Sequence, residues 1–250
     1  MSELFTIRTF VIERDIYARQ AVVSYLSWDR RTRVVGQAGT PHELLGQIHD
    51  DPDLRRLDVI VVDTGLAANA QGLSALVNLL LHHCPDACLV CLAHIPDYDM
   101  ALAAGGAGAA AYLVREQVGI GLASAVRFVL EHRFVVTEDM AALFEARGSG
   151  SLSYDVLPER RQYPRLTQRI EQALLLCVVE GLPAELAAEE MGVSTSTVRS
   201  YIKEGYRILE ASDDTIYPPT MSPVERAFLR YSALAVDYCY DFDSPMRPAA

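Results

Sequence analysis

Short apolar runs alternate with segments whose apolar residues recur at helical spacing throughout the first half of the chain. The clearest run is Val-Ile-Val-Val between Asp58 and Asp63, which is typical of a strand buried on both faces of a sheet. Five strands are predicted, at 6–12, 34–39, 58–63, 87–93 and 109–114. Helices are predicted after them, at 17–26, 41–48, 74–83, 98–104 and 118–132. This repeated order predicts an α/β domain with a parallel sheet and helices on both faces.

The second half of the chain shows helical patterns only, after a stretch rich in Gly and Ser at 147–154. Helices are predicted at 167–180, 183–191, 194–210 and 222–240. Gly192 permits a tight turn between the second and third of these helices, and Ser194 caps the third. We expect Leu186, Ala187 and Val198 to face the core. The pattern predicts an all-α helix-turn-helix domain with a C-terminal helical extension.

These patterns divide the chain into four parts. They are an α/β domain at 1–145, a linker at 146–163, a helix-turn-helix at 164–210, and a loop, extra helix and disordered tail at 211–250. The extra helix carries an apolar and aromatic stripe, so we expect it to pack on the helix-turn-helix or on a second chain, with a partner protein as the alternative. The stripe consists of Val224, Phe228, Tyr231, Ala235 and Tyr238.

Composition excludes several classes of protein. No run of 18 apolar residues and no signal-peptide pattern occurs. The five cysteines are an odd number in a long chain rich in core residues, which argues against a disulfide framework and for a reducing cytosol. A cytoplasmic protein without membrane contact is therefore expected. No catalytic constellation or phosphate-binding glycine loop stands out, so we expect neither an enzyme nor a cofactor. The only cluster resembling a metal site, at 82–91, places Cys88 and Cys91 on opposite faces of a strand, and we expect no metal.

The order of elements over about 5–145 resembles the receiver domain of bacterial response regulators, which has a flavodoxin-like fold. By this resemblance Asp63, after the third strand, holds the position of the phosphoacceptor. The family also uses an acidic pair that helps to hold Mg²⁺, a Thr or Ser after the fourth strand and a Lys after the fifth. The matching positions here are Glu13, Arg14, Asp15, Ala93 and Arg115, and the switch aromatic is Tyr112.

Three of these positions depart from the family pattern. Arg14 brings a positive charge near the metal site and is expected to replace Mg²⁺ as the partner of Asp63. Ala93 lacks the hydroxyl that couples phosphorylation to movement, and Arg115 replaces the Lys. The resemblance therefore implies an atypical receiver that works without phosphorylation. The alternative to a phosphoacceptor is a structural role for Asp63, in which it caps the next turn or pairs with Arg14 or Arg115. A separate alternative is that Asp15 reaches the metal, if the loop register shifts by one residue.

The stretch 164–210 is similar to the LuxR-type helix-turn-helix and to the related fourth region of sigma factors, most clearly from Ala187 to Arg199. The resemblance implies that the helix after Ser194 lies in the major groove of double-stranded DNA. Residues expected to contact bases or phosphates there are Thr195, Ser196, Arg199, Ser200 and Lys203. Contacts to the DNA backbone are expected from Arg207, and from Arg165, Thr167 and Arg169 near the first helix. The alternative is a solvated basic face on a bundle that binds protein.

A receiver, a linker and this helix-turn-helix form the layout of the NarL/FixJ class of response regulators. We expect a DNA-binding transcription regulator that acts as a homodimer. With so few Lys and Arg side chains in the helix-turn-helix, each half-site is expected to be bound with low affinity. The net charge of −11 favours an alternative, an interaction module that binds another regulator or RNA polymerase without direct DNA contact. A conventional regulator phosphorylated on Asp63 is the third hypothesis.

Overall fold

The computed structural model describes residues 6–150, 152–213, 215 and 217–235. They form two compact units, the first reaching to Glu159 and the second beginning at Arg160. Within these described ranges, no helix is long and apolar enough to cross a bilayer.

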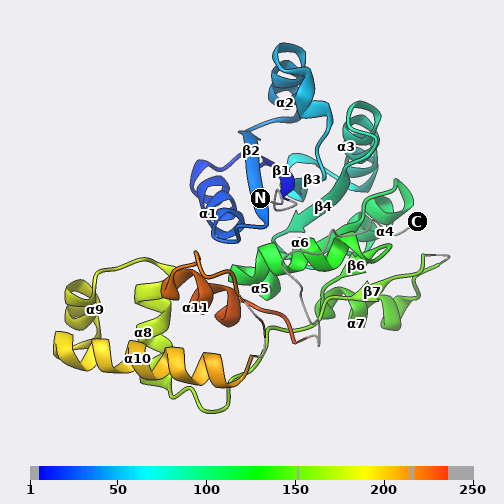
Figure 1. Cartoon of the computed structure of the whole chain (residues 1–250). Coiled ribbons are helices and arrows are strands. Elements are labelled where there is room, and N and C mark those ends of the chain that lie inside the picture. Colours follow the sequence, from blue (N-terminus) through cyan, green and yellow to red (C-terminus); the bar gives the residue numbers. More distant parts are fainter. Residues whose placement is uncertain (1–5, 151, 214, 216, 236–250) are drawn as a thin grey trace. The chain divides into compact units, whose positions relative to one another are not determined.

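The first unit is built on one sheet of seven parallel strands in the order β2-β1-β3-β4-β5-β6-β7 (Figure 1). The strands are β1 (Ile7–Ile12), β2 (Thr32–Ala38), β3 (Val59–Asp63), β4 (Cys88–Ala93), β5 (Ala111–Val114), β6 (Val135–Val136) and β7 (Asp155–Val156). Every residue of β3 is buried, and β3 pairs with β1 and β4. The predicted parallel α/β domain is confirmed.

Helices cover both faces of this sheet (Figure 1). One set is α1 (Ile16–Ser27) and α6 (Leu122–Leu130), which contact each other. The other set is α2 (Pro41–Asp50), α3 (Ala70–His83), α4 (Tyr98–Gly106) and α7 (Glu138–Arg147). This second set shares one hydrophobic core, in which Phe10, Ile60, Leu80 and Phe144 are nearly inaccessible to solvent. Short polar side chains start the helices, as Thr40 does for α2 by accepting a hydrogen bond from the amide of Glu43.

The first unit departs from the sequence prediction in its last third. The helix predicted at 118–132 is split into α5 (Arg115–Val118), a 3₁₀ turn η3 (Gly119–Gly121) and α6, because Gly119 has a φ of +47° and interrupts the helix. The predicted linker 146–163 is also wrong in part. Asp155–Val156 forms β7 and pairs with β6, so the first unit extends to Glu159. Two-residue strands are too short to produce a recognisable period in the sequence.

The second unit contains only helices and a short bridge. Its helices are α8 (Gln168–Leu174), which continues as a π-helical turn η4 (Leu175–Val179), then α9 (Ala184–Met191), α10 (Thr195–Ala211) and α11 (Pro223–Tyr231). The predicted turn between α9 and α10 is confirmed: Gly192 is left-handed with a φ of +64°, and the Ser194 hydroxyl accepts a hydrogen bond from the Thr197 amide at 3.1 Å. Val198 is fully buried as predicted, but Leu186 is 51% exposed, so its predicted place in the core is wrong.

The C-terminal extension packs on this helical unit through α11. The helix begins with a capping box of Ser222 and Glu225, and Phe228 is fully buried. It ends at Tyr231, earlier than the predicted end at 240, because the chain turns there and Leu234 pairs with Arg160 in an antiparallel bridge. The buried part of the predicted stripe is therefore Phe228 and Tyr231, whereas Val224 and Ala235 are exposed and Tyr238 lies outside the described residues.

Candidate functional site

The first candidate site lies where the parallel strands of the first unit end. Glu13 follows β1, Asp63 ends β3, Ala93 ends β4, and Arg115 follows β5. Because β1, β3, β4 and β5 are adjacent in that order, their carboxyl ends lie at one edge of the sheet. The fold thus brings Glu13, Asp63 and Arg115 together, although they lie far apart in the sequence.

Arg115 bridges the two carboxylates of this pocket. Its Nη2 atom lies 2.8 Å from Asp63 Oδ1 and also forms a close ion pair with Glu13 Oε2. The carboxylate side chains are only 4% and 7% exposed for Glu13 and Asp63, so this one guanidinium compensates two buried negative charges. Asp63 Oδ1 also accepts a hydrogen bond from the Gly65 amide at 3.1 Å, which caps the turn after β3.

The expected pairing of Arg14 with Asp63 is wrong, because Arg14 is exposed. The alternative prediction is confirmed: the partner of Asp63 is Arg115. Asp15 Oδ1 accepts hydrogen bonds from the amides of Tyr17 and Ala18 at 2.8 and 2.9 Å, so its side chain caps α1. These backbone bonds hold the pKa of Asp15 below its usual value. The sequence order Glu-Arg-Asp did not reveal which side chains turn inward, because that depends on where α1 begins.

The remaining two pocket positions are buried. Ala93 is 1% exposed and supplies no hydroxyl at the end of β4. Tyr112 on β5 is also 1% exposed, and burial raises the pKa of its phenol, with Asp97 and Cys91 adding to the shift and a hydrogen bond with Thr64 opposing it. Thr64, beside Asp63, is therefore the hydroxyl that Tyr112 meets inside the pocket.

The receiver resemblance implies a Mg²⁺ ion, and the residues present do not fit one. A Mg²⁺ ion needs carboxylate oxygens at about 2.0–2.1 Å in near-octahedral geometry. Here Arg115 Nη2 contacts the oxygens of Glu13 and Asp63 that would ligate the ion, and the other Glu13 oxygen accepts from the Asp15 amide at 2.9 Å. In the described part of the chain, no group of three or more His, Cys, Asp or Glu side chains is arranged to hold a metal.

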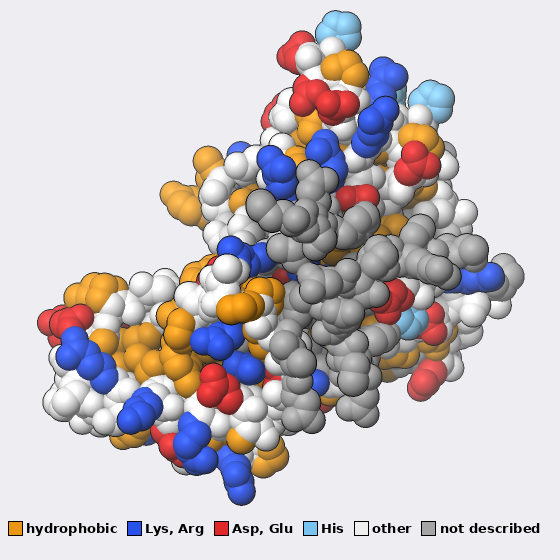
Figure 2. All heavy atoms as spheres, in the orientation of Figure 1, with side chains coloured by type: hydrophobic (Ala, Val, Ile, Leu, Met, Phe, Trp, Pro, Cys, Tyr) orange, Lys and Arg blue, Asp and Glu red, His pale blue; other side chains and the backbone are white. Residues whose placement is uncertain are grey.

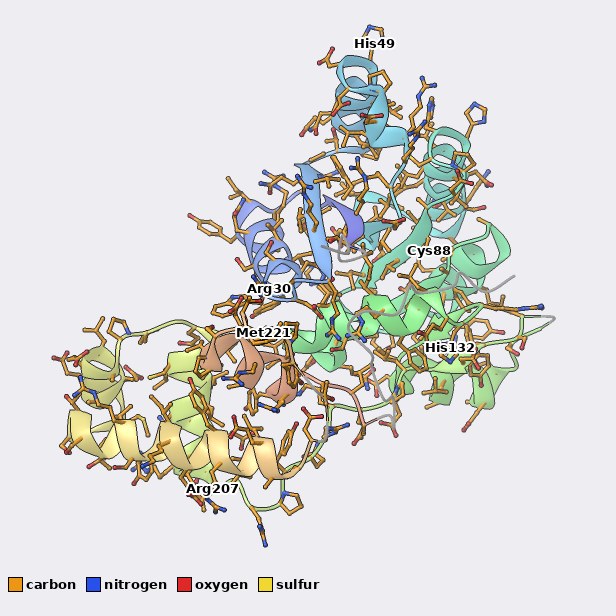
Figure 3. All side chains as sticks on the ribbon, viewed as in Figure 1. Arg30, His49, Cys88, His132, Arg207 and Met221 are labelled. Atoms are coloured by element: carbon orange, nitrogen blue, oxygen red, sulfur yellow. The ribbon has the colours of Figure 1, made fainter. Side chains whose placement is uncertain are left out.

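The second candidate site is the outer face of α10. Lys203 and three other polar residues that the sequence assigned to DNA contact, Ser196, Arg199 and Ser200, are exposed there, while Thr195 is half-buried. Arg207 projects outward from α10 in Figure 3. In Figure 2, Lys and Arg side chains recur along the surface of the second unit over this helix.

Most of these side chains already have partners within the unit. Arg199 Nη2 lies 2.8 Å from Glu185 Oε1 on α9, and Arg207 forms a two-pronged pair with Glu204 at 2.5 and 2.9 Å. The Ser200 hydroxyl donates to the Ser196 carbonyl at 3.0 Å. The exposed lysine, Lys203, lies between the two paired arginines along α10.

The three residues expected to contact the DNA backbone from the first helix are exposed. Thr167 caps α8 by accepting a hydrogen bond from the Ile170 amide, and Arg169 donates to the carbonyl of Met191 at 3.3 Å, near the turn before α10. Arg165 lies close enough to Glu204 to lower the pKa of that carboxyl, after the larger effect of Arg207. The loop before α8 and the middle of α10 thus share one surface.

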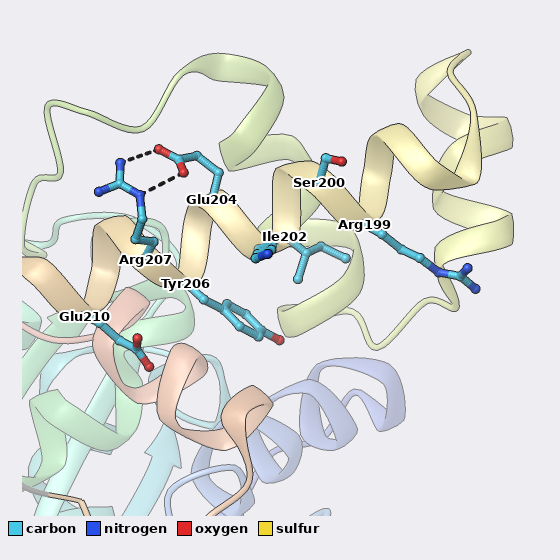
Figure 4. Close-up of a pocket in the computed structure, with 8 residues that line it drawn as sticks. Arg199, Ser200, Ile202, Glu204, Tyr206, Arg207 and Glu210 are labelled. Atoms are coloured by element: carbon cyan, nitrogen blue, oxygen red, sulfur yellow. Dashed lines mark hydrogen bonds and ion pairs between the residues drawn. The ribbon is translucent and has the colours of Figure 1, made fainter.

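A hollow of about 530 Å³ runs along α10 beside these bases (Figure 4). Charged side chains line this hollow together with two half-buried side chains, Ile202 and Tyr206. Sequence reasoning missed Ile202, Tyr206 and Glu185 as members of this surface. The Glu204–Arg207 pair was visible as acid and base three residues apart on a helix, whereas the Glu185 contact depends on how α9 crosses α10.

Comparisons with known proteins agree with this division of the chain. Residues 160–209 match the family model described as Sigma-70, region 4, which spans α8 to α10. The DNA-binding transcriptional activator DevR/DosR of Mycobacterium tuberculosis is 29% identical over 197 residues, covering 78% of this chain and 85% of the relative.

Two solved structures of lower sequence identity are also similar to this chain. RcsB of Salmonella enterica serovar Typhimurium, bound to promoter P1flhDC, is 15% identical with a TM-score of 0.48, covering 91% of this chain and 98% of that one. A LuxR-family response regulator from Aurantimonas sp. SI85-9A1 is 18% identical with a TM-score of 0.47, covering 57% and 98%.

Proposed function

The comparisons support a response regulator of the NarL/FixJ type, and on that premise we propose that this chain is a sequence-specific DNA-binding transcription regulator. The observation that carries the proposal is α10: a left-handed Gly192 and a serine cap present its outer face, with Arg199, Lys203 and Arg207 exposed. Such a helix fits the major groove, where arginine and lysine contact guanine edges or phosphates. Ser196, Ser200 and Thr195 supply hydroxyls on the same helix.

Backbone contacts in this proposal come from the loop before α8 and its first turn. Arg165, Thr167 and Arg169 are exposed there, and Arg165 lies near the middle of α10. Contacts of this kind fix the register of a protein on the duplex and carry no sequence information themselves. Base selection is therefore assigned to α10 alone.

We further propose that the receiver-like unit works without phosphorylation. The support is the ion pair of Arg115 with Asp63 and Glu13, which places a fixed cation against the carboxylate that would accept the phosphoryl group. Ala93 offers no hydroxyl to a phosphoryl group at the end of β4. A unit of this kind senses a ligand or a protein, or serves as the dimerisation module.

A homodimer is the third part of the proposal. Each helix-turn-helix carries three bases on α10, and the chain as a whole has a net charge of −11. Because DNA affinity comes largely from neutralised phosphates, one unit alone binds weakly, and two units on adjacent half-sites gain by acting together.

Selection of bound duplexes from a random DNA pool, at low and moderate salt, tests the main proposal. We expect a roughly palindromic motif for the wild type, and its loss for Arg199→Ala. Glu190→Ala, which changes another exposed charged residue of the same unit, is the control and retains the motif. Failure of the wild type to enrich any sequence at either salt would reject DNA recognition by this helix.

A second candidate function is favoured by charge. The exposed face of α9 carries Glu185, Glu189 and Glu190, and two of the three bases of α10 are already paired with acids. An acidic surface of this kind suits a protein partner such as another regulator or RNA polymerase. In that case Arg199→Ala leaves regulation intact, and the selection from the random DNA pool enriches no sequence for the wild type.

Phosphorylation is tested by incubating the protein with acetyl phosphate and Mg²⁺ and measuring its mass. We expect no phosphoryl adduct on the wild type and unchanged DNA affinity. An adduct on Asp63 that is lost in Asp63→Asn would restore the conventional mechanism for this regulator.

A further inference from the structure

Acidic side chains form ion pairs with two of the three basic side chains of α10. Glu185, on α9, pairs with Arg199 through one contact of 2.8 Å, and Glu204 pairs with Arg207 through two contacts of 2.5 and 2.9 Å (Figure 4). All four side chains are well exposed, at 68% and 60% for the first pair and 62% and 42% for the second. The pairs therefore lie on the surface that the proposed function assigns to DNA.

We propose that Glu185 and Glu204 are specificity-determining residues: they hold Arg199 and Arg207 away from the phosphates of unselected DNA. A duplex that offers only phosphates then meets a helix with one unpaired base, Lys203, and two carboxylates that repel it. A cognate site opens both pairs because it offers each guanidinium acceptors on a guanine edge. This inference rests on the proposed DNA-binding function.

The strengths of the competing contacts make this selection possible. An exposed ion pair is worth only a small factor in stability, up to about fivefold. A well-placed bidentate contact between arginine and guanine discriminates by about 5- to 100-fold, so it overcomes the internal pair. A single exposed phosphate contact in moderate salt is of the same order as the internal pair, and the two nearly cancel. The acids therefore reduce binding to random DNA more than binding to the selected site.

The two pairs restrain their arginines from different sides. Glu204 lies on the same helix as Arg207, three residues earlier, and holds both nitrogens that face it. Glu185 reaches Arg199 from α9, so this restraint depends on the crossing of the two helices of the motif. Arg199 and Arg207 both border the hollow along α10 that also contains Tyr206. Both arginines are thus held at its rim before any DNA arrives.

The test compares Glu185→Gln, Glu204→Gln and the double variant with the wild type in the full-length protein. Fluorescence anisotropy measures Kd for the selected duplex and for a random duplex across a range of salt concentrations. We expect the double variant to bind random DNA about 3- to 10-fold more tightly, whereas the Kd for the selected duplex changes less than about twofold. Each freed arginine steepens the slope of log Kd against log salt for random DNA by about 0.9.

Glu190→Gln is the matched control, because it removes the same charge from α9 and Glu190 makes no ion pair within the described residues. We expect its random-DNA affinity to rise less than about twofold. An equal rise in Glu190→Gln and Glu185→Gln would show a general charge effect and overturn the inference. A loss of selected-site affinity in Glu185→Gln would overturn it as well, because Glu185 would then orient Arg199 for the base. If the wild type binds neither duplex, the proposed DNA-binding function itself is rejected. If the wild type binds both duplexes with the same measurable Kd, DNA binding is retained and the inference about specificity is overturned.

Discussion

Arg115 is the residue that contributes most to the stability of the buried cluster of Glu13, Asp63 and Arg115. Removal of one partner from a buried ion pair leaves an uncompensated charge and costs about 3–5 kcal/mol. Arg115 is 19% exposed and compensates two buried carboxylates, so we expect Arg115→Ala to lower the free energy of unfolding of the first unit by about 3 kcal/mol. Trp28, the single tryptophan of the chain, lies in this unit and reports its urea unfolding by fluorescence.

Arg14→Ala is the matched control for Arg115→Ala. It removes the same charge from the same edge of the sheet, but Arg14 is exposed, and we expect its unfolding midpoint to stay close to that of the wild type. Arg115→Lys keeps the charge with a single ammonium, so its unfolding midpoint should lie between those of Arg115→Ala and Arg14→Ala. Similar midpoints for Arg115→Ala and Arg14→Ala would contradict the central role of Arg115.

Asp213 links the C-terminal extension to the first residues of the second unit, because it pairs with both Arg230 and Arg161. Its carboxylate lies 2.9 Å from Arg230 on α11 and 3.3 Å from Arg161, and it accepts a hydrogen bond from the Tyr217 hydroxyl at 3.0 Å. Burial raises the pKa of Asp213, but hydrogen bonds from Thr215, Tyr217 and Arg230 outweigh this effect and hold the pKa below its usual value. The ionised carboxylate therefore stabilises the folded unit.

This lowered pKa predicts how stability depends on pH. A depressed folded pKa contributes stability above the unfolded value of about 3.9, and this stability is lost as pH falls through the lower folded pKa. We expect amides of α8, α9, α10 and α11 to lose protection from hydrogen exchange, normalised for intrinsic rates, as the pH falls below about 4. Asp213→Asn should show reduced protection already at pH 7 and a weaker response to acid, whereas Glu189→Gln on exposed α9 should follow the wild type. Identical acid responses in Asp213→Asn and wild type would contradict this role.

At the scale of single elements, two glycines inside helices are expected to respond in opposite directions to alanine. Gly205 in α10 is buried, and an added Cβ would lie 2.9 Å from Leu174 Cδ2, so glycine there permits the close approach of α8 and α10. Gly46 in α2 is exposed and has nothing within 4 Å of the added atom. Helix propensity alone favours alanine over glycine at both positions, by about 1 kcal/mol.

We expect Gly205→Ala to destabilise the second unit by about 1 kcal/mol, because the cost of overpacking exceeds the gain in helix propensity. Hydrogen exchange of α8 and α10 should become faster. Gly46→Ala should stabilise the first unit by about 0.5–1 kcal/mol, measured by Trp28 fluorescence in urea. A stabilising Gly205→Ala would show that Leu174 moves aside at little cost.

Elements whose signals are local were predictable from the sequence. The tight turn at Gly192 and the helix cap at Ser194 each depend on neighbouring residues, and the structure has them as predicted. The two-residue strands β6 and β7 were missed because their pairing is made across the sheet. The sequence left open whether Asp63 pairs with Arg14 or Arg115, because that choice depends on strands β1, β3 and β5 ending at one edge of the sheet.

For the whole molecule, a net charge of −11 must be reconciled with DNA binding. The Lys and Arg side chains assigned to DNA lie on α10, in the loop before α8 and in the first turn of α8, so attraction is local while the remainder of the chain repels the duplex. A few local bases give one half-site low affinity. The proposed homodimer is therefore a consequence of the charge distribution as much as of the resemblance.

The dimer is tested with duplexes that carry one or two copies of the selected half-site. Because a second linked contact becomes intramolecular, we expect the two-copy duplex to bind about 10²- to 10⁴-fold more tightly than the one-copy duplex. The gain should vanish when half a helical turn is inserted between the copies, since the second α10 then faces the opposite side of the duplex. Sedimentation of the complex should give two chains per duplex. Equal affinity for one and two copies, with one chain bound, would mean that a single helix-turn-helix suffices despite its few bases, and that the acidic remainder of the chain repels DNA less than its charge implies.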